Sequence, residues 1–200
     1  MSESTGPSAR QVELLEAAYQ YVLEHGLADL SLRPLAKAIG SSTRVLTFLF
    51  GSKAGLVQAL LARARAGELA ALAAIESSPA GCSLVDNAQL LRVARELWAW
   101  LSADEHRSLL RLWFEGYARS LVEPDGAWAG FARATVTDWL AVLADAQPEH
   151  TRDTDDGRAQ RTQVLALLRG ALFDLLATGD VSRTSAAVHR HLDLMAAQQQ

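Results

Sequence analysis

Cysteine is nearly absent from this 200-residue chain, which has a single one, Cys82. One cysteine excludes an internal disulfide framework and is typical of a protein in a reducing cytoplasm. Lysine is scarce too, with Lys37 and Lys53 alone, and the abundance of arginine and alanine suggests a bacterium with a GC-rich genome. The longest uncharged apolar stretches fall far short of the roughly 18–20 residues that a membrane span requires. Because residues 1–10 lack the apolar core of a secretory signal, we expect a cytoplasmic protein with no membrane partner.

Runs of β-branched residues are also scarce, while alanine, leucine, arginine and glutamate dominate. Half of the residues are hydrophobic and 21% are charged, which is ordinary for a folded globular protein. Apolar residues recur at steps of three and four along almost every segment, the period of an amphipathic helix. The sequence therefore predicts an all-α protein of about nine helices.

The expected helices are separated by recognisable caps and breaks. Ser31 and Ser52 are placed to cap the helices that follow them, and Ser102 with Glu105 matches a capping box. We expect residues 148–157 to form a polar loop, and residues 77–83 to form a clear break. The expected helices lie at about 10–25, 32–39, 43–50, 53–75, 84–101, 102–121, 128–146, 158–178 and 182–197.

Positive charge is concentrated in one short part of an otherwise acidic chain. The net charge is -4, yet residues 27–53 carry four basic side chains and one acidic side chain. A local basic face can hold phosphates while the rest of the chain is acidic. The alternative is a solvated surface of mixed charge.

Residues 10–56 have the spacing of a helix-turn-helix. The second and third expected helices are short, and the tight turn at Gly40, Ser41 and Ser42 joins them. The third helix, ~10–12 Å wide with its side chains, fits the major groove of B-DNA. Gly40 permits the sharp turn, and the small side chain of Ala36 lets the two helices approach closely.

The same residues resemble the N-terminal signature of the TetR family of transcriptional regulators. The resemblance rests on Leu14–Ala18, Gly26, Ser31–Ala36, Gly40 and the segment Phe50–Leu56, about a quarter of the chain. It implies a helix-turn-helix domain at 1–52 and a helical ligand-binding and dimerisation domain at 53–200, which begins with a long linking helix at about 53–75. The partners implied are double-stranded operator DNA, a second copy of the chain and a small-molecule effector.

Roles in DNA binding follow from this match. Arg33 is placed to bind a guanine edge or a phosphate, and Lys53 a phosphate at a helix N-terminus. Phe48 packs on a sugar or a thymine methyl group, or else between helices as a core residue. We expect Leu35, Ile39, Leu46 and Phe50 to be core. The predicted DNA-binding residues are Arg33, Ser42, Thr43, Arg44, Thr47, Phe48 and Lys53.

The chain also departs from the family pattern near the expected recognition helix. Thr47 stands where the family usually has tyrosine, Leu49 where it often has histidine, and Arg44 where it usually has a small residue. These departures do not change the expected fold. Because they lie on or beside the recognition helix, the resemblance does not predict the operator sequence.

Two sets of C-terminal residues are candidates for further sites, with burial in the core as the alternative for both. The candidates for an apolar ligand pocket are Trp98, Trp113, Tyr117, Trp128 and Trp139. The candidates for a dimer interface on the last two helices are Leu165, Leu168, Leu172, Leu175, Val188, Leu192 and Met195.

Signals of other chemistry are weak. Asp153–Gly157 does not have the spacing of a calcium loop, and His189 and His191 lie on different sides of their helix. Since no catalytic motif is present, we expect no enzyme, metal or cofactor. The leading hypothesis is a ligand-responsive homodimeric repressor that a small apolar or aromatic molecule releases from a palindromic operator. Rivals are a helical protein–protein adaptor without DNA binding and, last, an all-helical enzyme.

Overall fold

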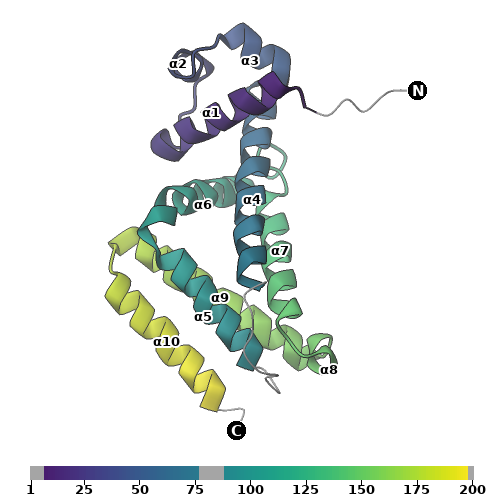
Figure 1. Ribbon diagram of the computed structural model, residues 1–200, viewed down its shortest axis with the longest axis vertical. Coiled ribbons are helices and arrows are strands. Elements are labelled where there is room, and N and C mark those ends of the chain that lie inside the picture. Colours follow the sequence, from purple (N-terminus) through teal and green to yellow (C-terminus); the bar gives the residue numbers. More distant parts are fainter. Residues whose placement is uncertain (1–6, 77–87, 198–200) are drawn as a thin grey trace, which may run out of the picture. The chain divides into compact units, whose positions relative to one another are not determined.

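The computed structural model describes residues 7–76 and 88–197, and every regular element in those residues is helical (Figure 1). Ten α-helices and one 3-10 turn follow one another, with no strand in the described part of the chain. The all-α prediction is therefore confirmed. The predicted break at 77–83, which includes Cys82, lies outside the described residues.

The helices pack into two compact units. The first unit contains residues 1–67 and 108–133, and the second contains residues 68–107 and 134–200. The chain thus enters each unit twice. The predicted division at residue 52 separates a DNA-binding region from a ligand-binding and dimerisation region, and it stays a prediction.

The first unit is built on the N-terminal helices. Its members are α1 (Ala9–His25), α2 (Leu32–Ala38), α3 (Thr43–Phe50), the first part of α4 (Lys53–Glu76) and most of α6 (Arg107–Val122). Each helix turns an apolar stripe inward, because its large apolar residues recur three or four positions apart. The buried core of this unit includes Tyr19, Val22, Leu30, Leu35, Leu46, Leu56, Leu60, Leu112, Trp113 and Trp128. Trp128 lies in the turn before α7, not at the start of the predicted helix at 128–146.

The second unit is built mainly from the C-terminal helices, which are α5 (Ala88–Ser102), most of α7 (Phe131–Asp145), α8 (Glu149–Arg152), α9 (Asp155–Thr178) and α10 (Val181–Ala197). Helices α5, α9 and α10 pack on one another. Trp98 of α5 is 1% exposed, and its indole nitrogen donates to the Ser185 hydroxyl of α10 at 3.0 Å. At the surface, Arg95 of α5 pairs with Asp193 of α10 at 2.7 Å. These contacts fix α10 on α5.

The predicted capping box at Ser102 and Glu105 is wrong. Helix α5 continues through Ser102, whose hydroxyl donates to the Ala99 carbonyl at 3.3 Å. A 3-10 turn at Asp104–His106 then leads directly into α6. His106 donates from Nδ1 to the Trp100 carbonyl at 2.8 Å and stacks on the Trp100 ring. These contacts hold the turn where the sequence suggested a capped helix start.

The predicted polar loop at 148–157 is also wrong, because α8 and the start of α9 occupy it. The Thr154 hydroxyl accepts a hydrogen bond from the Gly157 amide at 3.0 Å, so α9 begins three residues earlier than predicted. A Cβ atom at Gly157 would lie 2.0 Å from the Thr151 carbonyl oxygen. Glycine is therefore required where α8 and α9 meet.

Within the described residues, no single helix is long and apolar enough to cross a membrane. Helices α3 and α4 together have the length and apolar composition of a membrane span, but a bend of 69° separates them.

Candidate nucleic-acid interface

A tight turn joins α2 to α3. Helix α2 ends at Ala38, and Gly40 adopts a φ of 63°, which glycine reaches without steric cost. The Ser41 amide then donates to the Ala36 carbonyl at 2.8 Å and closes the turn. The buried Ala36 side chain adds little bulk where α2 and α3 pack together. The predicted role of Gly40 in the turn is confirmed.

Serine hydroxyls begin the two helices that follow this turn. Ser42 accepts from the Val45 amide at 3.2 Å at the start of α3. Ser52 accepts from the Gly55 amide at 3.1 Å at the start of α4, as predicted. Ser31 occupies the N-cap position of α2, as predicted, but its side chain makes no capping hydrogen bond. Because Ser42 uses its oxygen as an acceptor, its hydroxyl proton is available to a phosphate.

Helix α3 separates an inner face from an outer face. Leu46 is 1% exposed in the core beside Leu35, and Ile39 and Phe50 pack against that core while partly exposed. The outer face presents the predicted DNA-binding residues Thr43, Arg44, Thr47 and Phe48 together. Phe48 is 85% exposed, which excludes the alternative that it is a core residue between helices.

The basic side chains of this region have no counter-ion within residues 7–76 and 88–197. Arg33, Lys37, Arg44 and Lys53 are all exposed, and none forms an ion pair with another described residue. Elsewhere, arginines such as Arg183 are held by carboxylates. Exposed cations that no described carboxylate pairs with are suited to an anionic partner from outside the chain.

Two hydrogen bonds that the sequence pattern does not predict position the helix-turn-helix. Gln11 of α1 donates from its amide nitrogen to the Leu49 carbonyl of α3 at 3.1 Å, across 38 positions. Glu115 of α6 accepts from the Leu27 amide at 2.8 Å, across 88 positions. Neither pairing leaves a signal in local periodicity, because its partners are far apart in sequence.

An ion pair also ties α1 to α4. Arg63 donates to both oxygens of Glu16, at 2.8 and 3.2 Å, and lies 4.7 Å from the centre of the Tyr19 ring. The hydrogen bond from Arg63 lowers the pKa of Glu16, and burial raises the pKa of Tyr19. The pair fixes the angle at which α4 leaves the three N-terminal helices.

The family model described as bacterial regulatory proteins of the tetR family matches residues 14–60. This segment contains α2, α3, the turn between them and the exposed cations. Over these 47 residues, about a quarter of the chain, the sequence is similar to the N-terminal region of the TetR family. No curated protein is similar enough to match the chain.

Solved structures extend the likeness over nearly the whole chain. A TetR transcription regulator from Haloarcula marismortui has a TM-score of 0.68 and 18% identity, over 90% of this chain and 93% of that one. The fatty acid degradation regulator FadR from Bacillus halodurans has a TM-score of 0.64 and 18% identity, over 94% and 96%. The multidrug binding protein EbrR, complexed with imidazole, has a TM-score of 0.63 and 26% identity, over 90% and 88%. The N-terminal match and the fold are those of DNA-binding transcriptional regulators.

The predicted pocket residues belong to both compact units. In the first unit, Trp113 stacks with Tyr117 at 5.1 Å between ring centroids, and Trp128 lies in the same core. In the second unit, Trp98 is hydrogen-bonded to Ser185, and Trp139 donates to the buried carboxylate of Glu68 at 2.6 Å. All four tryptophans are buried, and their role as ligand contacts stays a prediction.

The predicted dimer residues are buried within a single chain. All of them lie on α9 or α10, and each is between 0% and 6% exposed in the single chain. This matches the alternative of ordinary burial, because the same apolar stripes face α5 and each other. A dimer of these helices has to use their outer faces.

Proposed function

We propose that this protein is a TetR-family homodimeric repressor, which occupies a palindromic operator and is released by a small apolar or aromatic effector. The observation that carries the proposal is the outer face of α3, where Arg44, Thr47 and Phe48 are exposed and Arg44 forms no ion pair with another described residue. The site of action is the cytoplasm, where the DNA is.

Each exposed group on this face is matched to a part of the duplex. Arg44 in the first turn of α3 reads a guanine edge, to which its guanidinium can donate twice. Arg33, Thr43, Thr47 and the Ser42 hydroxyl contact phosphates or nearby base edges. Lys53 binds a phosphate at the N-terminus of α4, where the helix dipole also favours an anion.

Phe48 is the apolar contact of this interface. Phe48 is 85% exposed, so a partner that covers its ring gains the free energy of burying that apolar surface. The major groove offers one apolar group on its floor, the C5 methyl of thymine. We infer that Phe48 covers such a methyl group, one helical turn after Arg44.

A second copy of the chain is proposed to cover the outer faces of α9 and α10. Four exposed residues of α9 recur on one stripe, namely Ala166, Gly170, Phe173 and Ala177. Phe173 is 59% exposed, and Leu194 of α10 is 54% exposed. Small residues beside one large apolar side chain allow helices of two copies to approach closely, and a symmetric dimer suits a palindromic site.

The dimer is tested by charge substitution. Phe173→Glu with Leu194→Glu buries two carboxylates in the proposed interface, so analytical ultracentrifugation should report a monomer. Val122→Glu replaces another exposed apolar residue, 76% exposed on α6, and should leave the dimer intact. A dimer that survives the double substitution would refute this interface.

The effector is proposed to act on the spacing of the two DNA-binding regions. Successive major grooves on one face of DNA lie ~34–36 Å apart, so a dimer whose regions are spaced otherwise loses one half-site. An effector shifts this equilibrium by its difference in affinity for the two states. EbrR is a multidrug binding protein solved with imidazole, which agrees with a small apolar or aromatic effector here.

The interface is tested by paired substitutions. Arg44→Ala with Lys53→Ala should weaken operator binding at least a hundredfold, while Arg158→Ala, whose guanidinium pairs with Asp155 at 3.1 Å, should change it less than twofold. The operator is first selected from random double-stranded DNA. Unchanged affinity in the double variant would refute this interface.

The second candidate function, a protein–protein adaptor, is motivated by a specific residue. Thr47 lacks the tyrosine that the family pattern usually has at this position, so an adaptor that no longer binds DNA remains the second candidate. An empty selection from random DNA, together with a stable protein partner in a pull-down, would favour it.

A further inference from the structure

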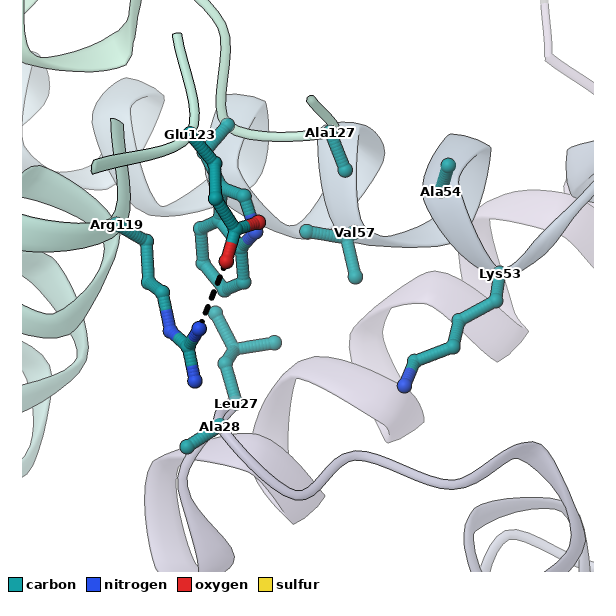
Figure 2. Close-up of a pocket in the computed structure, with 9 residues that line it drawn as sticks. Leu27, Ala28, Lys53, Ala54, Val57, Arg119, Glu123 and Ala127 are labelled. Carbon is teal, nitrogen blue, oxygen red and sulfur yellow. Dashed lines mark hydrogen bonds and ion pairs between the residues drawn. The ribbon is translucent and has the colours of Figure 1, made fainter. Parts of the chain in front are cut away.

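A surface pocket of about 390 Å³ opens in the first unit, between the turn after α1, the start of α4 and the end of α6 (Figure 2). Its apolar floor consists of Leu27, Val57 and Trp128, which are 2%, 3% and 8% exposed. The lining also includes three alanines: Ala28, Ala54 and Ala127. Because these side chains stop at Cβ, the space between the elements stays unfilled.

The rim of the pocket is positively charged. Arg119 donates to Glu123 at 2.8 Å, and this pair is neutral as a whole. Lys53 lines the same pocket and forms no ion pair with another described residue. Figure 2 shows Lys53 and Arg119 reaching into the pocket from opposite sides, with Leu27 and Val57 between them. The pocket thus combines an apolar floor with one uncompensated cation beside the N-terminus of α4, whose dipole favours an anion.

We propose that this pocket binds a small anionic amphipath, an apolar or aromatic group that carries one carboxylate. The carboxylate binds Lys53, while the apolar part covers Val57 and Trp128. Ligand pockets in proteins measure roughly 300–1,000 Å³, so a pocket of about 390 Å³ suits a ligand of one or two rings.

Binding here has a direct consequence for DNA, which rests on the proposed function. Lys53 is also the proposed phosphate contact. A carboxylate bound in the pocket neutralises the single charge of its ammonium group and so weakens its attraction for a phosphate. The ligand and the DNA therefore compete for Lys53. This competition differs from an effector that changes the spacing of a dimer, because it removes one phosphate contact from each protomer.

The first experiment measures binding without DNA. Calorimetry on the full chain uses 2-naphthoate as the probe and 2-naphthamide, its neutral analogue of the same shape, as the control ligand. We expect naphthoate to bind at least tenfold more tightly than the amide, and Lys53→Gln to remove most of that difference. Equal affinity for the two probes, or no heat from naphthoate at millimolar concentration, would overturn the proposal.

A pocket-filling variant locates the bound probe. Ala54 is exposed on the first turn of α4, so Ala54→Leu adds bulk to the pocket without removing a core contact. It should abolish naphthoate binding, whereas Ala62→Leu, at an exposed position of the same helix outside the pocket, should not. Ala28→Leu fills the pocket from the other side if Ala54→Leu fails to fold. Wild-type affinity in a folded filled variant would overturn the site.

The second experiment tests the competition. With naphthoate at saturation, the slope of log K against log salt for operator binding should fall by about 0.9 per protomer, the value for one lost phosphate contact. An unchanged slope, with naphthoate bound, would overturn the shared role of Lys53. If the chain binds naphthoate yet no DNA in any selection, the proposed function fails and the ligand site stands.

Discussion

Glu115 of α6 accepts a hydrogen bond at 2.8 Å from the backbone amide of Leu27, the second residue after α1. One carboxylate thereby fixes the turn between α1 and α2 from a helix that lies 88 positions away. We expect Glu115→Ala to lower the free energy of unfolding by about 1–3 kcal/mol, because it leaves the amide of the buried Leu27 without this partner.

Urea denaturation followed by circular dichroism measures this loss. Glu105→Ala is the matched control, since Glu105 is an exposed carboxylate of the preceding 3-10 turn, and its removal should change stability by less than ~0.5 kcal/mol. An equal loss in both variants would contradict the specific role of Glu115.

The two serines at helix starts differ in their contribution to stability. Ser52 accepts from the Gly55 amide, whereas Ser31 makes no capping hydrogen bond. Ser52→Ala should therefore cost about 0.5–2 kcal/mol, and Ser31→Ala should cost almost nothing. Thermal or urea unfolding of the two variants provides the comparison. A larger loss of stability in Ser31→Ala than in Ser52→Ala would contradict the capping role assigned to Ser52.

The ion pair between Glu16 and Arg63 makes stability depend on pH. The hydrogen bond from Arg63 lowers the pKa of Glu16 from its ordinary 4.5. Because the folded state holds this carboxylate ionised, the pair stabilises the fold above pH 4.5 and ceases to do so as the pH falls through the lowered pKa. Both side chains are more than a third exposed, so the coupling should be modest, about 0.5 kcal/mol.

A double-mutant cycle of Glu16→Gln and Arg63→Gln measures this coupling at neutral and at acid pH. The pair of Arg10 and Glu13, with side chains 53% and 66% exposed, is the control and should show weaker coupling. Coupling that persists undiminished at acid pH would contradict the assigned ion pair.

The contact of Phe48 with thymine predicts sensitivity to a single methyl group. Replacing thymine by deoxyuridine at the contacted step should weaken binding about fourfold, the equivalent of ~0.8 kcal/mol for one buried methyl group. Phe48→Ala should bind both operators equally and should be as stable as the parent, since the side chain is 85% exposed. A deoxyuridine scan that affects the parent and Phe48→Ala alike would contradict this contact.

Local pattern predicted the helix-turn-helix well, because its determinants are close together in sequence. Gly40 marks the turn, and Leu35 and Leu46 lie one on each side of it in the core. Periodicity reveals that a helix face is buried but not what buries it. Leu168 and Val188 were for that reason predicted to face a second chain, whereas they are fully buried within their own.

The remaining differences have the same physical origin. Ser102 and Glu105 carry the letters of a capping box, yet the contacts of His106 with Trp100 favour a 3-10 turn there. The hydrogen bond between Glu115 and Leu27 joins segments whose proximity depends on the packing of whole helices. Such pairings follow from tertiary structure and have no counterpart in the local sequence.

Helix α3 and Lys53 are proposed to bind operator DNA through phosphates and base edges. The most direct test is a salt titration of binding between the full chain and the DNA upstream of its own gene, with random DNA of equal length as the reference. We expect tight binding by at least two protomers per site, and a slope of log K against log salt of about -0.9 for each phosphate contacted. Binding no tighter than to random DNA, both here and with operators chosen by unbiased selection, would contradict it.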